Sequence, residues 1–155
     1  MERLSALFAQ FLRNAQKRKY RYSQAMDYTI ELDEKQLDSM ENILSEELLD
    51  LGVQSLLLID LAGNIIVNLD DGKNERDIYS LAALAAGNFG AVSEMAKIIG
   101  EQDFSVLYHK GEKDSIFFNK VSKDLLLVTV FGKDVSLGFL RLKVAEAVRK
   151  IEETI

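Results

Sequence analysis

The sequence predicts an α+β domain with a largely antiparallel sheet. Hydrophobic periodicity changes along the chain in the order helix, two strands, long helix, three strands, helix. Every direct link between strands is short, as antiparallel neighbours allow. No proline interrupts the chain, and 155 residues suit a single domain. We therefore expect one sheet with helices covering its faces.

The first 32 residues differ in character from the rest. Residues 1–22 carry six basic side chains against one acidic side chain, so their net charge is +5 and the other 133 residues carry −11 of the total of −6. Residues 20–32 have no helical period. We expect an amphipathic, basic N-terminal helix and linker over residues 1–32 and the main domain over residues 33–155. The apolar stripe of this helix, within residues 3–19, is Leu4, Leu7, Phe8, Phe11, Leu12 and Ala15.

The main domain is predicted to begin with a helix and a hairpin. Asp33 is a suitable N-cap, the apolar stripe of the helix runs to Leu51, and Gly52 follows its end. Two apolar runs, residues 55–60 and 65–69, flank a turn that contains glycine and asparagine. Such a pair of runs predicts a β-hairpin.

A long helix is predicted over residues 77–99, with Gly100 as its C-terminal stop. The chain then returns to short apolar runs separated by polar turns. The elements expected there are strands over residues 104–109, 115–119 and 125–131 and a final helix over residues 137–153.

The long helix has two different faces on a helical wheel. One broad arc is apolar enough to pack on a sheet. The other arc carries mainly small residues, with Gly87 and Gly90 where a surface helix usually has Lys or Glu. Glycine inside a helix costs about 0.5–1 kcal/mol relative to alanine, so we interpret this arc as a surface that another backbone approaches. Relief of crowding within the monomer is the alternative. The sheet-facing arc is Ile78, Leu81, Ala82, Leu84, Ala85, Asn88, Phe89, Val92, Met95, Ala96 and Ile99, and the outward arc is Tyr79, Ser80, Ala83, Gly87, Gly90, Ala91, Glu94 and Lys97.

The chain offers few groups for catalysis or metal binding. It has no cysteine, and His109 is its only histidine, which excludes thiolate chemistry and any site built on several histidines. The spacing of Asp70, Asp71, Asn74 and Glu75 does not fit a twelve-residue calcium loop and favours a solvated turn. No phosphate-binding glycine motif occurs. We expect no catalytic residue, no metal and no cofactor.

Charge and hydropathy limit the partners and the location. A net charge of −6 argues against a general nucleic-acid binder. No apolar run approaches the roughly 20 residues of a membrane span, and no secretory signal pattern is present. We expect a cytoplasmic protein that binds no nucleic acid. The helix within residues 3–19 could contact an anionic membrane surface or pack into a groove on a protein, and its short apolar face favours protein packing.

Five sequence blocks occur in an order and spacing that are specific when taken together. They are LLID at residues 57–60 with Gly63, SLAALAAGN at 80–88, AKIIGE at 96–101, HKGEKDS at 109–115 and VSLGFLRL at 135–142. With these blocks, residues 53–151 resemble the roadblock (dynein light chain) family. Within that family the sequence is most similar to the bacterial MglB-type regulators of Ras-like GTPases. The N-terminal helix has no counterpart in this resemblance.

The resemblance implies a five-stranded antiparallel sheet with the long helix on one face and the other two helices on the opposite face. It also implies a homodimer or a paralogous heterodimer, formed through edge strands and long helices. For MglB-type members, the resemblance further implies that the paired helices dock a GTP-loaded Ras-like protein and stimulate hydrolysis by repositioning the GTPase's own residues. The cellular processes that it implies are cell polarity and motility. The contact positions carried over are Ala83, Gly87, Gly90, Ala91 and Glu94.

We therefore expect a homodimeric regulator of a small Ras-like GTPase that has no active site of its own. The competing class is a structural adaptor dimer that leaves GTP hydrolysis unchanged. Arg141 and Arg149, on the polar side of the last helix, are expected to be solvated rather than to act on a partner's phosphate. A ligand-sensing domain would need a polar internal cavity, whereas the predicted core is aliphatic.

Overall fold

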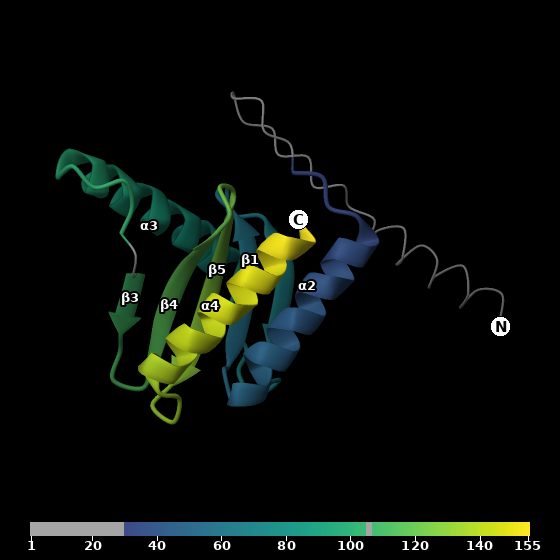
Figure 1. Ribbon diagram of the computed structural model, residues 1–155. Coiled ribbons are helices and arrows are strands. Elements are labelled where there is room, and N and C mark those ends of the chain that lie inside the picture. The colour runs from purple at the N-terminus through teal and green to yellow at the C-terminus, as the bar shows by residue number, and fades with distance from the viewer. Residues whose placement is uncertain (1–29, 105–106) are drawn as a thin grey trace, which may run out of the picture.

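The computed structural model describes residues 30–104 and 107–155 (Figure 1). The predicted α+β class and the predicted order of elements are confirmed in this part of the chain. The helix expected within residues 3–19 lies outside the described residues. The elements are α2 (Glu34–Glu47), the short 3-10 helix η1 (Leu49–Leu51), β1 (Ser55–Asp60), β2 (Ile65–Asp70), α3 (Ile78–Ile98), β3 (Leu107–Lys110), β4 (Asp114–Val121), β5 (Leu125–Gly132) and α4 (Leu137–Thr154).

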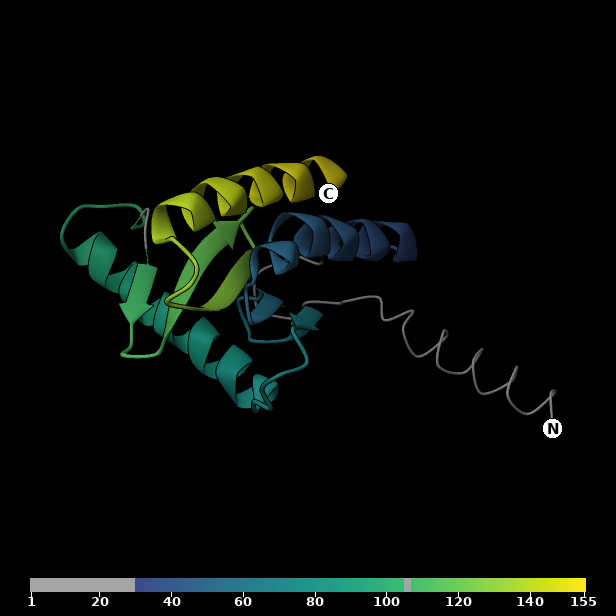
Figure 2. The same ribbon diagram turned by 90° about the horizontal axis from the view of Figure 1, so that it is seen from below.

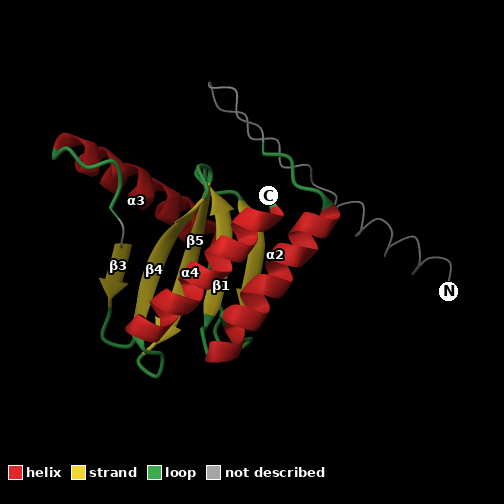
Figure 3. Ribbon diagram, in the orientation of Figure 1, coloured by secondary structure: helices red, strands yellow, loops and turns green. Residues whose placement is uncertain are grey.

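The strands form one five-stranded sheet in the order β2-β1-β5-β4-β3, and every neighbouring pair is antiparallel (Figure 3). β1 and β5 pair at its centre, with Leu57 opposite Val128. Helices α2 and α4 lie side by side over one face, and α3 covers the other, as Figure 2 shows. The three-layer arrangement expected from the family resemblance is therefore confirmed.

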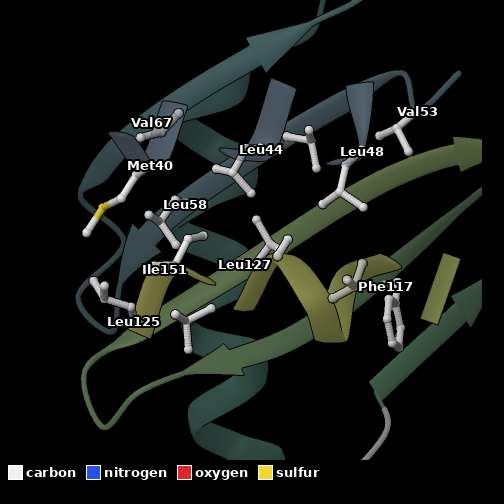
Figure 4. Close-up of a cluster of buried hydrophobic side chains, with 14 of the residues drawn as sticks. Met40, Leu44, Leu48, Val53, Leu58, Val67, Phe117, Leu125, Leu127 and Ile151 are labelled. Carbon is white, nitrogen blue, oxygen red and sulfur yellow. The ribbon is translucent and has the colours of Figure 1, made fainter. Parts of the chain in front are cut away.

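Each face of the sheet has its own apolar core. The cluster under α2 and α4 includes Met40, Leu44 and Ile151 from the helices, which meet Leu127 of β5 (Figure 4). The cluster under α3 takes the alternate residues of the same strand, such as Val128. Because β5 is central and covered on both faces, all eight of its residues are buried.

Helix α2 begins where the sequence indicates, but it ends at Glu47, and the 3-10 helix η1 takes the place of the predicted continuation to Leu51. The side chain of Asp33 accepts a hydrogen bond from the backbone N–H of Gln36 at 2.8 Å, and the Gln36 side chain accepts one from the backbone N–H of Asp33 at 2.9 Å. This reciprocal pair is a capping box. Gly52 follows η1 with a φ of +93°, a conformation that favours glycine.

The boundaries of β3 and β4 differ most from the expectation, whereas those of β1, β2 and β5 agree within one residue. Strand β3 begins at Leu107, and Phe104 lies in the loop before it with its ring partly exposed. Strand β4 extends beyond residues 115–119 at both ends, to Asp114 and Val121. The polar residues at these ends, including Lys120, remain in the ladder because they pair with β5, whose apolar run is continuous. Cross-strand hydrogen bonding decides the strand length here, and residue type does not.

Candidate protein interaction surface

Helix α3 is fixed at both ends by local signals. The Asp77 carboxylate accepts hydrogen bonds from the backbone N–H of Ser80 at 3.1 Å and from its hydroxyl at 2.6 Å. These hydrogen bonds from Ser80 lower the pKa of Asp77. At the other end, Gly100 adopts a φ of +87° and stops the helix.

The face of α3 that packs on the sheet is lined mainly by alanine. Ala82, Ala85, Ala86 and Ala96 are buried there together with Phe89. Small side chains bring a helix backbone close to the sheet beneath it. The turn between β1 and β2 also approaches α3, since a Cβ on Gly63 would lie 2.9 Å from the Cα of Ala83.

The outward face of α3 carries large apolar side chains. Leu84 is 72% exposed, Ile98 is 83% exposed and Ile99 is 68% exposed. The expectation that Leu84, Asn88, Met95 and Ile99 pack on the sheet is therefore wrong, since all four are exposed. A helical wheel gives only the angular position of each residue, and the bulkier apolar side chains favour the wrong arc here. The alanines occupy the sheet-facing positions, and the bulkier side chains are turned outward.

The predicted contact positions all lie on this outward side. Ala83, Gly87, Gly90, Ala91 and Glu94 are exposed along α3. A Cβ added to Gly87 or to Gly90 would meet no described atom within 4 Å. Within the described residues, the monomer therefore does not require glycine at either position. Relief of crowding inside the monomer does not explain these two glycines there.

The outward side has little charge to keep it solvated. Glu94 and Lys97 are the two charged residues among the 21 of α3, and Lys97 Nζ donates to Glu94 Oε1 at 2.6 Å. This hydrogen bond raises the pKa of Lys97. An exposed helix face that is apolar and glycine-rich is typical of a protein contact surface. We call it the α3 face: Tyr79, Ala83, Leu84, Gly87, Gly90, Ala91, Glu94, Met95 and Ile98.

The other polar candidates have local partners. The ring of His109 packs edge-on against Phe118, with ring centroids 5.6 Å apart. Asp70 accepts from the backbone N–H of Gly72 at 2.6 Å, and Asp71 accepts from that of Lys73 at 3.0 Å, so both carboxylates stabilise their own turn. Among the described residues, no group of three or more potential ligands could hold a metal ion.

The two arginines of the last helix lie far from the α3 face in the architecture. Arg141 is exposed on α4, and Arg149 forms an exposed pair with Glu153 at 2.6 Å. Helix α4 is on the opposite side of the sheet from α3 (Figure 2). This position agrees with the expectation that both arginines are solvated.

Within residues 30–104 and 107–155, no helix combines the length and the apolar character needed to cross a membrane.

The fold defines a three-layer α+β domain that exposes the apolar α3 face. The family model of the Roadblock/LC7 domain matches residues 40–131. The chain belongs to the Roadblock/LC7 domain family, as its sequence resemblance predicts.

Solved structures of MglB proteins are similar to this chain. Myxococcus xanthus MglB is 30% identical, with a TM-score of 0.72, over 80% of this chain and 92% of that one. The gliding protein MglB from Thermus thermophilus is 26% identical, with a TM-score of 0.74, over 83% of this chain and 97% of that one. A structure described as MglB with a tetrameric arrangement is 26% identical, with a TM-score of 0.74, over 84% of this chain and 100% of that one. No curated protein matches the sequence. The predicted MglB-like membership is confirmed.

Proposed function

We propose that this protein is a homodimeric, cytoplasmic regulator of a small Ras-like GTPase. It acts through the α3 face and stimulates GTP hydrolysis by reorienting the GTPase's own catalytic residues. The observation that carries the proposal is the exposure of Leu84 and Ile98 beside Gly87 and Gly90 on one helix face. The MglB likeness of the chain supports the choice of a GTPase as partner.

The chemistry of the α3 face supports the proposal of a dimer. Burying one large aliphatic side chain stabilises an interface by about 1.5–3 kcal/mol. Gly87 and Gly90 have open space above them, so a second helix could approach the α3 backbone closely. Strand β3 is also an edge strand with one neighbour in the described sheet, and it offers unpaired backbone groups beside this helix.

The proposed mechanism requires no catalytic group from this protein. Arginine fingers act on a phosphate in trans, but α3 contains no arginine. The contact positions Ala83, Gly87, Gly90, Ala91 and Glu94 are small or acidic. They suit close packing against the partner's backbone, which holds the partner's own catalytic groups in place.

The first test is affinity capture from the native lysate with the full chain as bait. One sample contains a non-hydrolysable GTP analogue and the other contains GDP. Retention of a Ras-like GTPase with the analogue in preference to GDP supports the proposal. Single-turnover hydrolysis by the captured GTPase, with and without this protein, then tests for stimulation.

The adaptor hypothesis makes a different prediction in the same experiment. A structural adaptor retains its partner equally with both nucleotides and leaves the hydrolysis rate unchanged. Either result would replace the regulator hypothesis with the adaptor hypothesis.

A further inference from the structure

The outer side of α2 is strongly acidic. Seven exposed acidic residues lie between residues 31 and 50, against one exposed basic residue, Lys35. None of the seven forms an ion pair with another described residue. The seven are Glu31, Asp33, Glu34, Asp38, Glu41, Glu46 and Asp50.

An apolar patch lies beside the far end of this acidic side. Phe139 is 49% exposed and Leu142 is 69% exposed on the N-terminal half of α4. Lys143 bridges Glu47 of α2 at 3.6 Å and lies over the Phe139 ring at 5.9 Å. These contacts place the patch next to the last turn of α2. Together, the seven acidic residues, Phe139 and Leu142 are called the α2–α4 outer surface.

The chain itself supplies a segment of complementary chemistry. Residues 1–22 carry a net charge of +5, and the apolar stripe from Leu4 to Leu12 precedes the basic run at residues 17–19. We propose that residues 3–21 dock on the α2–α4 outer surface of the same chain, antiparallel to α2, with residues 3–19 as an amphipathic helix.

Basic and apolar residues follow one another along residues 3–21 in the order that antiparallel docking on the α2–α4 outer surface requires. Residues 17–21 are near the start of α2 in sequence, so their basic side chains meet Glu34, Asp38 and Glu41. The apolar stripe lies further from the connection and reaches the level of Phe139 and Leu142. At 1.5 Å per residue, the 14 residues of α2 span about 21 Å and residues 4–19 would span about 24 Å as a helix.

The short covalent connection between residues 3–19 and α2 favours docking within the same chain over binding of a separate molecule. Residues 20–29 connect the proposed helix to the described start of the domain. A flexible linker of ten residues has a root-mean-square length of about 17 Å, which corresponds to an effective concentration in the millimolar range. Long-range attraction between the +5 segment and the acidic side of α2 further favours docking within the same chain. This attraction weakens as the salt concentration is raised.

Docking on this surface leaves the α3 face accessible, because α2 and α4 lie on the other side of the sheet. The inference is therefore independent of the proposed function. A variant that releases residues 3–21 is expected to bind the same partner as the unchanged chain.

Crosslinking in the full-length chain tests the proposal. The chain has no cysteine, so two introduced cysteines form the only reactive pair. We expect Ser5→Cys with Ala145→Cys to react with a short bis-maleimide within one chain, several-fold faster than Ser5→Cys with Lys97→Cys on α3. Adding Leu142→Asp, or Asp38→Lys with Glu41→Lys, should remove most of this advantage. The matched charge control, Glu101→Lys with Glu112→Lys, should retain it.

Three outcomes would overturn the proposal. Equal rates for the two cysteine pairs would mean that residues 3–21 have no preferred site on α4. Products linking two chains would assign the docking surface to the twin subunit. Sedimentation of the full chain with phosphatidylcholine–phosphatidylglycerol vesicles, without the intrachain product, would assign the segment to a lipid surface.

Discussion

Gly63, in the turn between β1 and β2, lies directly against Ala83 of α3, because a Cβ on Gly63 would come within 2.9 Å of the Ala83 Cα. Gly63 also has a φ of +87°. One residue of the hairpin turn thus fixes how closely α3 approaches the sheet edge. The turn meets the backbone of the helix at Ala82 and Ala83, and Ala83 itself remains exposed on the α3 face.

Replacing Gly63 with alanine is expected to destabilise the protein. The positive φ costs about 1–2 kcal/mol for a residue with a side chain, and the clash with the α3 backbone adds about 1–3 kcal/mol. Urea unfolding of the full chain measures the sum. Gly72→Ala is the matched control, because Gly72 has a φ of +72° but nothing within 4 Å of its Cβ position. Equal losses for the two variants would show that the contact with Ala83 contributes nothing.

The stability of the packing between α2 and α4 should depend on pH through Glu47. Lys150 donates a hydrogen bond to Glu47 and lowers the pKa of that carboxyl, and the same bond raises the pKa of Lys150. The Glu47 contribution is therefore complete above its unfolded pKa, near 4.5, and is lost as the pH falls through the lower folded value. The Lys150 contribution is present below about 10.5 and is lost as the pH rises through its raised value.

We expect Glu47→Gln to destabilise the protein at pH 7 more than at strongly acidic pH. Urea unfolding at both values gives the comparison. Glu153→Gln is the control, because its pair with Arg149 is largely exposed and contributes little. If Glu47→Gln changes the free energy of unfolding equally at both pH values, the pH dependence of stability does not come from Glu47.

A large side chain at Gly90 should block the partner without unfolding the monomer. The Cβ position of Gly90 is open, so Gly90→Arg is accommodated within the chain and projects from the α3 face. We expect at least about 100-fold weaker binding of the captured GTPase, measured by titration, which corresponds to about 2.7 kcal/mol. Asn42→Arg, on α2, should leave binding unchanged. Unaltered affinity in a folded Gly90→Arg protein would exclude this surface.

A charge at Leu84 should separate the proposed dimer. Both copies carry the substitution in a symmetric interface, so losing two buried leucines costs about 3–6 kcal/mol. Analytical ultracentrifugation over a dilution series should show Leu84→Asp as a monomer where the unchanged chain is a dimer. Leu142→Asp, at a similarly exposed leucine on α4, should remain dimeric. A dimeric Leu84→Asp protein would move the interface away from α3.

Most of the fold could be predicted from the sequence because its signals are local. Asp33, Asp77 and Gly100 mark helix ends by their own hydrogen bonds or backbone conformation. The hairpin turn depends on Gly63, and the central strand β5 is a continuous apolar run. Each of these features requires only a few neighbouring residues to act.

The orientation of α3 could not be predicted in the same way. The helix is apolar around most of its circumference, so a wheel cannot tell a core leucine from an interface leucine. The expected arcs place Leu84 toward the sheet, but Leu84 is exposed. They include Ala86 in neither arc, but Ala86 is buried. Contacts with Gly63 and the sheet decide the rotation, and those contacts exist only in three dimensions. The roles of Ala83, Gly87, Gly90, Ala91 and Glu94 as contacts stay a prediction.

The pairing of β1 with β5 has a consequence for how the chain folds during synthesis. Strand β1 leaves the ribosome with β2 as its only available neighbour, while its other partner is still untranslated, since Leu57 pairs with Val128. Until β5 and α4 emerge, the apolar stripe of α2 and the open edge of β1 are exposed to other nascent chains. Pairing across so long a stretch of sequence slows the final step of folding. Molecules truncated before β5 lack the strand that contributes to both cores.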